Sequence, residues 1–475
     1  MKRQYSLLLM SSLLFQSQLA VAGQHQSIQI GKMMLVASND IQPVAELPYY
    51  KGQDVPMGQS SSESKQSLLP EDDGAQNDSE LFSTSGSGYI HPFLSVGEEY
   101  TDNLYNIDQD KTNNFLTRIS PGIWMSIPKI KEAPVTVAAK NTSAGGLLMA
   151  LPDYEGFERF NAYLLGALDY KMYSTDSDLN DTDAKIEGLF KYNLRGGLSL
   201  QALDSFTSSQ DRFEIGNAGE DPVRRYKSNL SQAVADWDFS DKLRTKVEFS
   251  NFYLNYSEAI DDFLDRSDND ASWYGFYKYS PKTSLFVQYQ YIDVSYDTNT
   301  GWDNTQDFYY AGINWASTEK TSLRMKAGYQ NVDYEKSLAQ TLNEDNNGWA
   351  LELALKYQIT VKTEISLALS HKTEESDSTL AIGQEVSTGI VHYKQQFTEK
   401  LLGICDLSLE NHNYTQLRVA GERDDDRYIF RPALQYVFKD WLMAEMAYQF
   451  DTRNSTDDLF DYASNTISFS LNSAF

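Results

Sequence analysis

Residues 349–375 read WALELALKYQITVKTEISLALSHKTEE, and apolar and polar residues alternate along this stretch. Leu351, Leu353 and Leu355 share one parity, while charged or small residues occupy the positions between them. The alternation resumes after a short polar segment at residues 360–362. A repeat of two residues indicates β-strands, because a helix would place its apolar residues three and four positions apart. The stretch therefore predicts two antiparallel strands joined by a tight turn.

The same hairpin pattern recurs along the chain. Its turns contain Ser, Asp, Pro or Lys, which suit a sharp reversal. Longer acidic connections such as EAIDDFLDRSDND and NSTDDLFD separate one hairpin from the next. Short turns at one end of the strands and long polar loops at the other are typical of outer-membrane barrels. The further turns are predicted at residues 240–242, 280–282, 317–320, 398–400 and 439–440.

The number of strands follows from these connections. We predict an all-β protein, a transmembrane antiparallel up-and-down barrel of about 18 strands with a range of 16–20. An even number places both termini on the periplasmic side. Residues 129–159 fit the pattern worst, either as an insertion on the turn side, as a further strand pair, or as a segment folded into the lumen. Strand starts are expected near residues 89, 115, 160, 184, 197, 226, 243, 271, 284, 306, 322, 347, 363, 383, 401, 427, 441 and 461.

The beginning of the chain differs from the remainder. Lys2 and Arg3 precede a short apolar run that ends in a small-residue cleavage motif, so residues 1–22 are predicted to be a signal peptide. Residues 23–86 are polar, Ser-rich and acidic, and we expect a flexible periplasmic segment. Within that segment SIQIGKMMLVA could form a short strand or bind a partner. The barrel is expected over residues 87–475.

Composition excludes several classes of protein. The formal net charge of −27 argues against a nucleic-acid partner, because phosphate contacts require Lys and Arg. A single cysteine, Cys405, excludes an internal disulfide. Beyond the signal peptide no apolar run is long enough for a transmembrane helix. The 31 tyrosines and 23 phenylalanines suit strands and the aromatic girdles of a barrel.

The polar parity of the strands carries long charged side chains. A hydrated lumen accommodates them, whereas an interior filled by side chains does not. A soluble β-protein with its charges outside would show the same alternation and remains the alternative. Aromatic Tyr274, Phe276, Phe286 and Tyr310 share the inward parity. The charges could instead pair across a narrow lumen and only stabilise it. The candidate pore-lining residues are Arg244, Lys246, Glu248, Lys278, Arg324, Lys326, Glu352, Lys356, Glu364, Arg431 and Glu445.

The sequence ends NTISFSLNSAF, at residues 465–475. Ile467, Phe469, Leu471 and Phe475 have one parity and are expected to face outer-membrane lipid. A strand in lipid must have its backbone groups paired, so this last strand is expected to close the sheet against the first. A terminal aromatic residue on the lipid-facing parity resembles the signal that barrel-assembly machinery recognises. These residues are therefore the predicted assembly signal.

No pattern indicates catalysis. The five histidines have no metal-ligand spacing, and no nucleophile or phosphate-binding motif occurs in its required context. Cys405 shares the apolar parity of its strand and is expected to face lipid. The acidic segment STDSDLNDTDA and the run Asp424 to Asp426 could hold a divalent cation, but they lack the spacing of a calcium loop. We expect no enzymatic activity, no cofactor and no metal site.

Two early segments carry a resemblance to a known family. Residues 98–103 read EEYTDN after an apolar strand, and residues 119–122 read ISPG. In these motifs the chain resembles a large family of porin-like outer-membrane β-barrel proteins associated with exopolysaccharide synthesis and export. The resemblance covers most of the chain after residue 88 and implies a barrel of this size that moves polysaccharide across the outer membrane. It implies no catalytic residues.

Three hypotheses of function follow. The first is translocation of a polar polymer, foremost exopolysaccharide export, with the N-terminal segment reaching a periplasmic polysaccharide-export component. The second is a general diffusion porin for small solutes. The third is a structural or adhesive surface barrel with a closed lumen. All three place the protein in the cell outer membrane with both termini in the periplasm.

Overall fold

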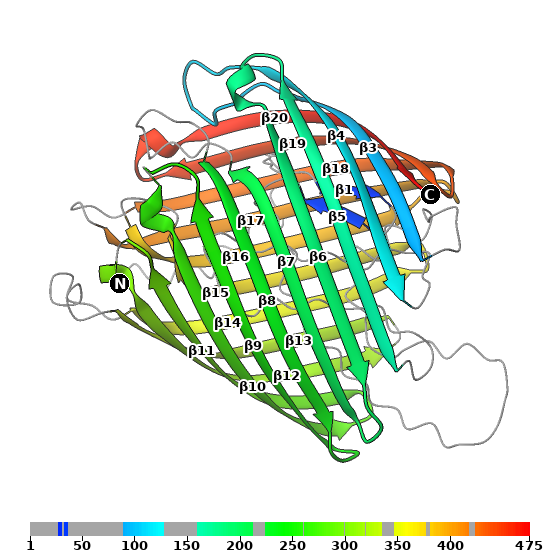
Figure 1. Cartoon of the computed structure of the whole chain (residues 1–475), viewed down its shortest axis with the longest axis vertical. Coiled ribbons are helices and arrows are strands. Elements are labelled where there is room, and N and C mark those ends of the chain that lie inside the picture. The colour runs from blue at the N-terminus through cyan, green and yellow to red at the C-terminus, as the bar shows by residue number, and fades with distance from the viewer. Residues whose placement is uncertain are drawn as a thin grey trace.

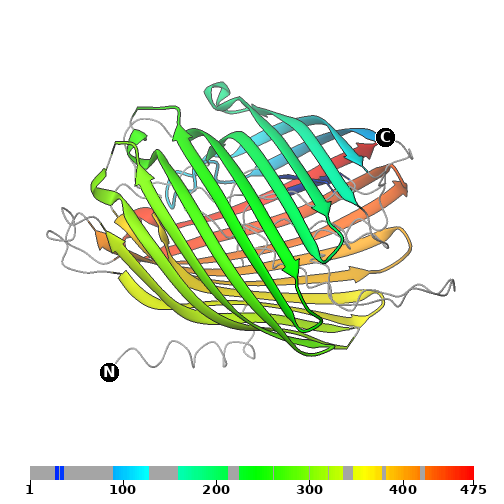
Figure 2. The same ribbon diagram turned by 60° about the horizontal axis from the view of Figure 1, so that its bottom comes forward.

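The computed structural model shows a closed antiparallel β-barrel (Figure 1, Figure 2). Neighbours in the chain are neighbours in the sheet, so the topology is up-and-down throughout. The predicted fold class is therefore confirmed. The structure describes residues 27–30, 33–36, 89–127, 159–211, 224–259, 261–298, 300–318, 320–334, 346–376, 381–417 and 423–475.

The barrel has 18 strands within these residues, which confirms the predicted number. Strand β10 begins at Arg266 and β18 at Arg423, several residues before their predicted starts. Their first residues are polar, yet they still pair with neighbouring strands, because a sheet can continue beyond its apolar band. The strands are β3 (Ile90–Thr101), β4 (Asn114–Ile127), β5 (Phe160–Tyr173), β6 (Asp181–Asn193), β7 (Leu198–Asp211), β8 (Arg224–Asp238), β9 (Leu243–Tyr256), β10 (Arg266–Ser280), β11 (Thr283–Tyr296), β12 (Asn304–Thr318), β13 (Thr321–Tyr334), β14 (Asn346–Thr360), β15 (Thr363–Glu375), β16 (Ala381–Gln396), β17 (Leu401–Leu417), β18 (Arg423–Lys439), β19 (Leu442–Ser455) and β20 (Tyr462–Ala474).

The barrel closes where β20 pairs with β3. Leu471 lies opposite Val96 in this ladder, and Ala474 lies opposite Phe93. One residue beyond the strand, the backbone N–H of Phe475 donates to the carbonyl of Pro92 at 2.9 Å, and its ring stacks on Trp441. The last residue thus contacts β3 and the turn before β19, the two elements beside the end of the closing strand.

The two faces of β20 have opposite chemistry. Ile467, Phe469, Leu471 and Phe475 are exposed on the outside of the barrel, whereas Ser468, Ser470 and Asn472 are buried on its inside. The predicted parity is confirmed. No helix among the described residues is long and apolar enough to span a membrane.

A row of aromatic side chains crosses the outer surface from β11 to β14. Tyr289 lies opposite Tyr309, which lies opposite Tyr329, which in turn lies opposite Trp349. All four rings are exposed. Exposed aromatic rings also gather beside the short turns, including Trp237, Phe239, Tyr279, Phe397 and Phe438. Exposed aromatic rings beside the turns are typical of the aromatic girdle of a barrel that spans a membrane.

The connections differ at the two ends, as predicted. Two residues join β10 to β11, and two join β14 to β15. At the other end short 3-10 turns shape several loops: η3 (Ser177–Leu179), η4 (Asp262–Leu264), η5 (Thr300–Trp302) and η6 (Asp458–Phe460). Asp265, after η4, accepts hydrogen bonds from the Tyr256 N–H and the Asn255 amide, both at 2.6 Å. Burial raises the pKa of Asp265 above its ordinary value.

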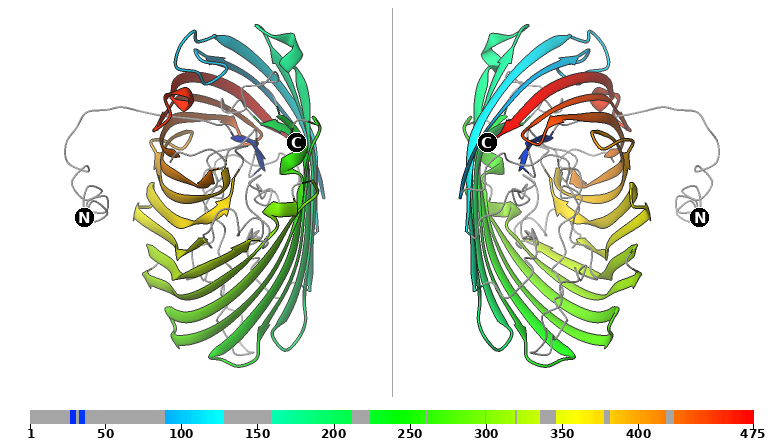
Figure 3. Two further views of the ribbon diagram at one scale, coloured as in Figure 1. Left: turned by 90° about the vertical axis from the view of Figure 1, so that its left-hand side faces the viewer. Right: turned by 90° about the vertical axis from the view of Figure 1, so that its right-hand side faces the viewer.

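The insertion at residues 129–159 joins β4 to β5, which are adjacent antiparallel partners at the short-turn end. It therefore adds no strand to the barrel, and its path lies outside the described residues apart from Arg159. Residues 1–22 and most of the segment 23–86 also lie outside them. Within SIQIGKMMLVA the structure has a hairpin of β1 (Ser27–Ile30) and β2 (Met33–Val36) that lies inside the barrel, against β20 and β3 (Figure 3).

The outward position of Phe469 gives a test of the membrane assignment. Replacing Phe469 by Arg puts a charge into the lipid-facing band, and we expect it to lower the free energy of unfolding by about 2–4 kcal/mol. Urea unfolding of the protein in lipid vesicles measures the loss. Ser470→Thr, on the inner face one residue away, is the control and should unfold like the wild type. Equal stabilities of Phe469→Arg and the wild type would contradict a lipid-facing β20.

Candidate functional site

The inner wall of the barrel is the candidate site, and the predicted pore-lining residues all have the inward parity. Arg244, Lys246, Glu248, Arg324, Lys326, Glu364, Arg431 and Glu445 are buried, and Lys278, Glu352 and Lys356 are half-buried. They come from strands β9, β10, β13, β14, β15, β18 and β19, so the set runs around a large part of the wall.

Most of these charges pair along the wall rather than across the lumen. The Lys326 ammonium lies 2.9 Å from the Glu352 carboxylate on the next strand. The Lys356 ammonium lies 3.4 Å from the Glu364 carboxylate, on the strand that follows a single turn. These ion pairs of the candidate pore-lining residues thus join residues of one strand or of two neighbouring strands. The hypothesis that the charges pair across a narrow lumen therefore receives no support from these contacts, because every such pair leaves the opposite wall uninvolved. Further pairs of this kind are Arg244 with Asp236, Lys246 with Glu248, and Arg431 with Glu445.

Four of these cations lie over aromatic rings. The Lys246 ammonium is 4.0 Å from the centre of the Tyr274 ring. The Lys326 ammonium is 4.3 Å from the centre of the Tyr310 ring. The guanidinium carbon of Arg244 is 5.1 Å from the centre of the Phe276 ring. The guanidinium carbon of Arg324 is 5.0 Å from the centre of the Phe286 ring. Since all four rings are buried on the inner face, strands β9 to β13 carry an aromatic and cationic patch, which we call the aromatic patch.

Amide side chains continue this wall toward the loops. Gln288 lies next to the aromatic patch and accepts a hydrogen bond from Lys326 at 3.2 Å. Gln290 donates to Asp270 at 2.5 Å, and Gln330 donates to Gln306 at 3.3 Å. All of these side chains are buried. Amides both donate and accept, so the wall offers hydrogen bonds of both kinds beside its aromatic rings.

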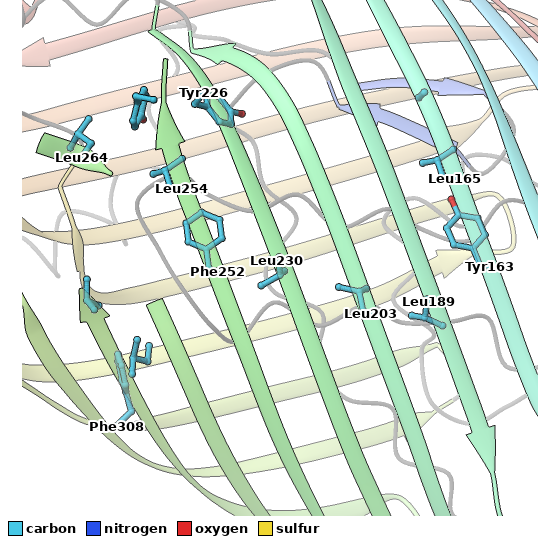
Figure 4. Close-up of a cluster of buried hydrophobic side chains, with 14 of the residues drawn as sticks. Tyr163, Leu165, Leu189, Leu203, Tyr226, Leu230, Phe252, Leu254, Leu264 and Phe308 are labelled. Atoms are coloured by element: carbon cyan, nitrogen blue, oxygen red, sulfur yellow. The ribbon is translucent and has the colours of Figure 1, made fainter. Parts of the chain in front are cut away.

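An apolar stripe crosses the inner face of β5 to β9, beside buried charged residues of the same strands such as Lys171 and Asp183. Leu189 lies directly opposite Leu203, and Leu230 lies opposite Phe252, all buried on the inside (Figure 4). Leu264 of η4 joins the same cluster. Alternation does not predict this stripe, because several of these strands have apolar residues on both parities, as in LLGAL at residues 164–168. Apolar residues on both parities do indicate that both faces of the strand are apolar, but they do not identify which residues point inward.

The acidic loop residues have partners within the protein. Asp176 caps η3 through the N–H of Asp178 at 3.0 Å and accepts from the Tyr105 hydroxyl. Asp183 lies 2.6 Å from the Lys171 ammonium, and Asp425 pairs with Arg423. Among the described residues no group of three or more His, Cys, Asp or Glu side chains could hold a metal ion. The calcium alternative thus finds no site in this part of the chain.

The fold and its wall define a class, a porin-like outer-membrane β-barrel. The chain belongs to the family described as "Putative beta-barrel porin 2", whose model matches residues 156–475. No curated protein matches the chain.

Solved structures of outer-membrane proteins match the chain at low similarity. The crystal structure of OccK5 (OpdH) from Pseudomonas aeruginosa is 12% identical, with a TM-score of 0.41, over 81% of this chain and 98% of that one. OccAB3 from Acinetobacter baumannii is 11% identical, with a TM-score of 0.42, over 81% and 99% of the two chains. A bacterial polysaccharide outer membrane secretin is 9% identical, with a TM-score of 0.32, over 81% and 98%. Similarities this low carry no argument about what the barrel transports.

The pair Arg431–Glu445 tests whether wall pairs hold the barrel together. The Arg431 guanidinium lies 2.5 Å from Glu445 and 3.7 Å from Asp406. Glu445→Gln removes the nearer of these two carboxylates from a buried cation, and we expect the free energy of unfolding to fall by about 2 kcal/mol. Urea unfolding in lipid vesicles measures the change. Adding Arg431→Gln should restore part of the loss, and a double variant less stable than Glu445→Gln alone would contradict the pairing.

Proposed function

We propose that the barrel conducts polar, sugar-like solutes across the outer membrane, and that its cargo is an exopolysaccharide leaving the cell. The aromatic patch carries this proposal. Aromatic rings present flat apolar faces, and the amides and charges beside them present hydrogen-bonding groups. A sugar ring has one apolar face and a rim of hydroxyl groups, so this combination matches it. A wall of charges alone would suit small ions equally well.

The family membership supports the coarser part of the proposal, a porin-like channel rather than an enzyme. The resemblance of the early strand motifs to proteins associated with exopolysaccharide export supports the finer part. In this proposal both termini lie in the periplasm, residues 23–86 reach a periplasmic export component, and Ile467, Phe469, Leu471 and Phe475 form the signal for the assembly machinery. The lumen-facing charges then line the hydrated route.

A general diffusion porin is the second candidate, and the wall pairs favour it. Paired charges of both signs leave a route without strong selectivity for the sign of a solute. The two candidates differ in the size of the cargo.

Deleting the protein in its host and staining for surface polysaccharide separates them, because only an exporter is required for the polymer to appear. Unchanged polysaccharide would overturn export, and planar-bilayer conductance would then distinguish an open porin from a closed structural barrel.

The aromatic patch gives a sharper test. Replacing Phe276 and Tyr310 together by Leu removes two inner rings and keeps the apolar volume, and we expect surface polysaccharide to fall about fivefold. Tyr329→Leu removes an exposed ring from the outer surface of the neighbouring strand β13 and should leave the polysaccharide unchanged. Gel mobility before and after heating shows that each variant is folded. Equal polysaccharide in the inner and outer variants would contradict a role for the patch.

A further inference from the structure

Arg324 is an exception among the charged residues of the wall. Its side chain is buried on β13, and none of its three guanidinium nitrogens has a hydrogen-bond partner within the described part of the chain. No other buried side chain there has three such atoms. Buried polar groups in native proteins are nearly always hydrogen-bonded, and an uncompensated buried cation is costly. Such a residue therefore requires an explanation.

The neighbouring carboxylates do not supply the missing partner. Glu248 and Glu352 act on Arg324 electrostatically, but neither forms a hydrogen bond with it. Glu248 pairs instead with Lys246, and Glu352 pairs with Lys326. Each acid is thus occupied by a lysine, while the planar five-donor fork of Arg324 stays available.

Two polar side chains accompany Arg324 on the inner face. Asn314 lies directly opposite Arg324 in the ladder between β12 and β13, and Ser284 lies opposite Asn314 between β11 and β12. Both are buried, and the Ser284 hydroxyl and the Asn314 amide oxygen also lack partners in the described residues. A hydroxyl can turn its hydrogen toward an anion. The open donors of this row are therefore the Arg324 guanidinium and the Ser284 hydroxyl, and Asn314 between them can donate only through its amide nitrogen, because its amide oxygen accepts.

An aromatic platform lies beside this row. Arg324 lies over the Phe286 ring, and Phe286 contacts Phe276 with ring centres 5.4 Å apart. Gly312 makes room for this platform, because a Cβ there would lie 2.3 Å from the tip of the Phe286 ring and 2.6 Å from the Met325 carbonyl oxygen. Any larger residue at position 312 would have to displace the ring on which the guanidinium rests.

We propose that Arg324, Ser284 and Asn314, with Phe286 and Phe276 beside them, form a lumen site for the carboxylate of an acidic sugar. A guanidinium binds a carboxylate through two parallel hydrogen bonds, which satisfies the donors that the protein leaves open. The neighbouring rings contact the apolar face of the sugar that carries the carboxylate. The inference rests on the proposed sugar passage and names its class of cargo, a carboxylated rather than a neutral saccharide.

The test compares two trisaccharides on the purified full chain in detergent micelles. Isothermal titration calorimetry with trigalacturonate and with maltotriose measures the affinity for an acidic and a neutral sugar. We expect trigalacturonate to bind about tenfold more tightly, because charge-assisted hydrogen bonds are roughly twice as strong as neutral ones. Equal affinities for the two sugars would overturn the site and would mean that water alone satisfies Arg324.

Variants assign the preference to this residue. Arg324→Gln should abolish the preference for trigalacturonate, and Arg324→Lys should keep part of it. Arg427→Gln is the matched control, because Arg427 is also a buried arginine of the barrel but pairs with Asp451 at 3.0 Å and is not among the candidate pore-lining residues. Its preference should equal that of the wild type. A preference that survives in Arg324→Gln, or that is lost equally in Arg427→Gln, would overturn the assignment.

Two further measurements keep the test decisive. Unfolding in urea should show Arg324→Gln at least as stable as the wild type, since no hydrogen bond is lost. If Arg324→Gln does not fold, Phe286→Leu keeps the cation, removes the ring beside it, and should weaken the binding of trigalacturonate by several-fold; unchanged binding would overturn the site. The polysaccharide stain of the deletion strain is independent of these results, so export can fail while the acidic-sugar site stands, and the reverse.

Discussion

Backbone hydrogen bonding in a medium without water is the constraint on which the whole structure depends. Each unpaired N–H or C=O in hydrocarbon costs several kcal/mol, so an open sheet edge is not stable there. The pairing of β20 with β3 removes the only two edges that an 18-strand up-and-down sheet would have. The ties of Phe475 to Pro92 and Trp441 complete that seam at its turn end. Alternating chemistry then follows, because every closed strand has one face toward lipid and one toward the lumen.

Ion pairing on the inner wall follows a local rule. Neighbouring strands place directly opposed side chains within about 5 Å of each other, a separation that lysine and arginine reach easily. A carboxylate on the next strand is therefore closer to a lysine or arginine than any group on the opposite wall, and the two form the ion pair. The pairs Lys326–Glu352 and Lys356–Glu364 follow this rule. Charged residues can in this way stabilise the wall through their neighbours on adjacent strands, whereas Arg324 has no such carboxylate opposite it.

The wall is not uniform around the barrel. Seen along its axis the barrel is flattened rather than round, with β5 to β9 forming one broad side (Figure 3). That side carries the apolar stripe of Leu189, Leu203, Leu230 and Phe252 on its inner face. The aromatic patch begins where β9 and β10 meet and continues to β13. A solute in the lumen thus meets an apolar surface and an aromatic, cationic surface on neighbouring strands.

The sequence by itself determined the strands, their number and their two faces, because alternation is a local property that each strand carries in its own residues. It also placed Arg244, Lys246, Tyr274 and Phe286 on the inner face for the same reason. It could not determine which of these residues meet. The register between strands, set by the turns and the closure, decides that Glu352 lies opposite Lys326 while Ala354 lies opposite Arg324. That single difference leaves Arg324 without a carboxylate, and only the tertiary structure could show it. The apolar stripe was hidden for a related reason, since a strand apolar on both faces has no alternation by which its inner residues can be recognised.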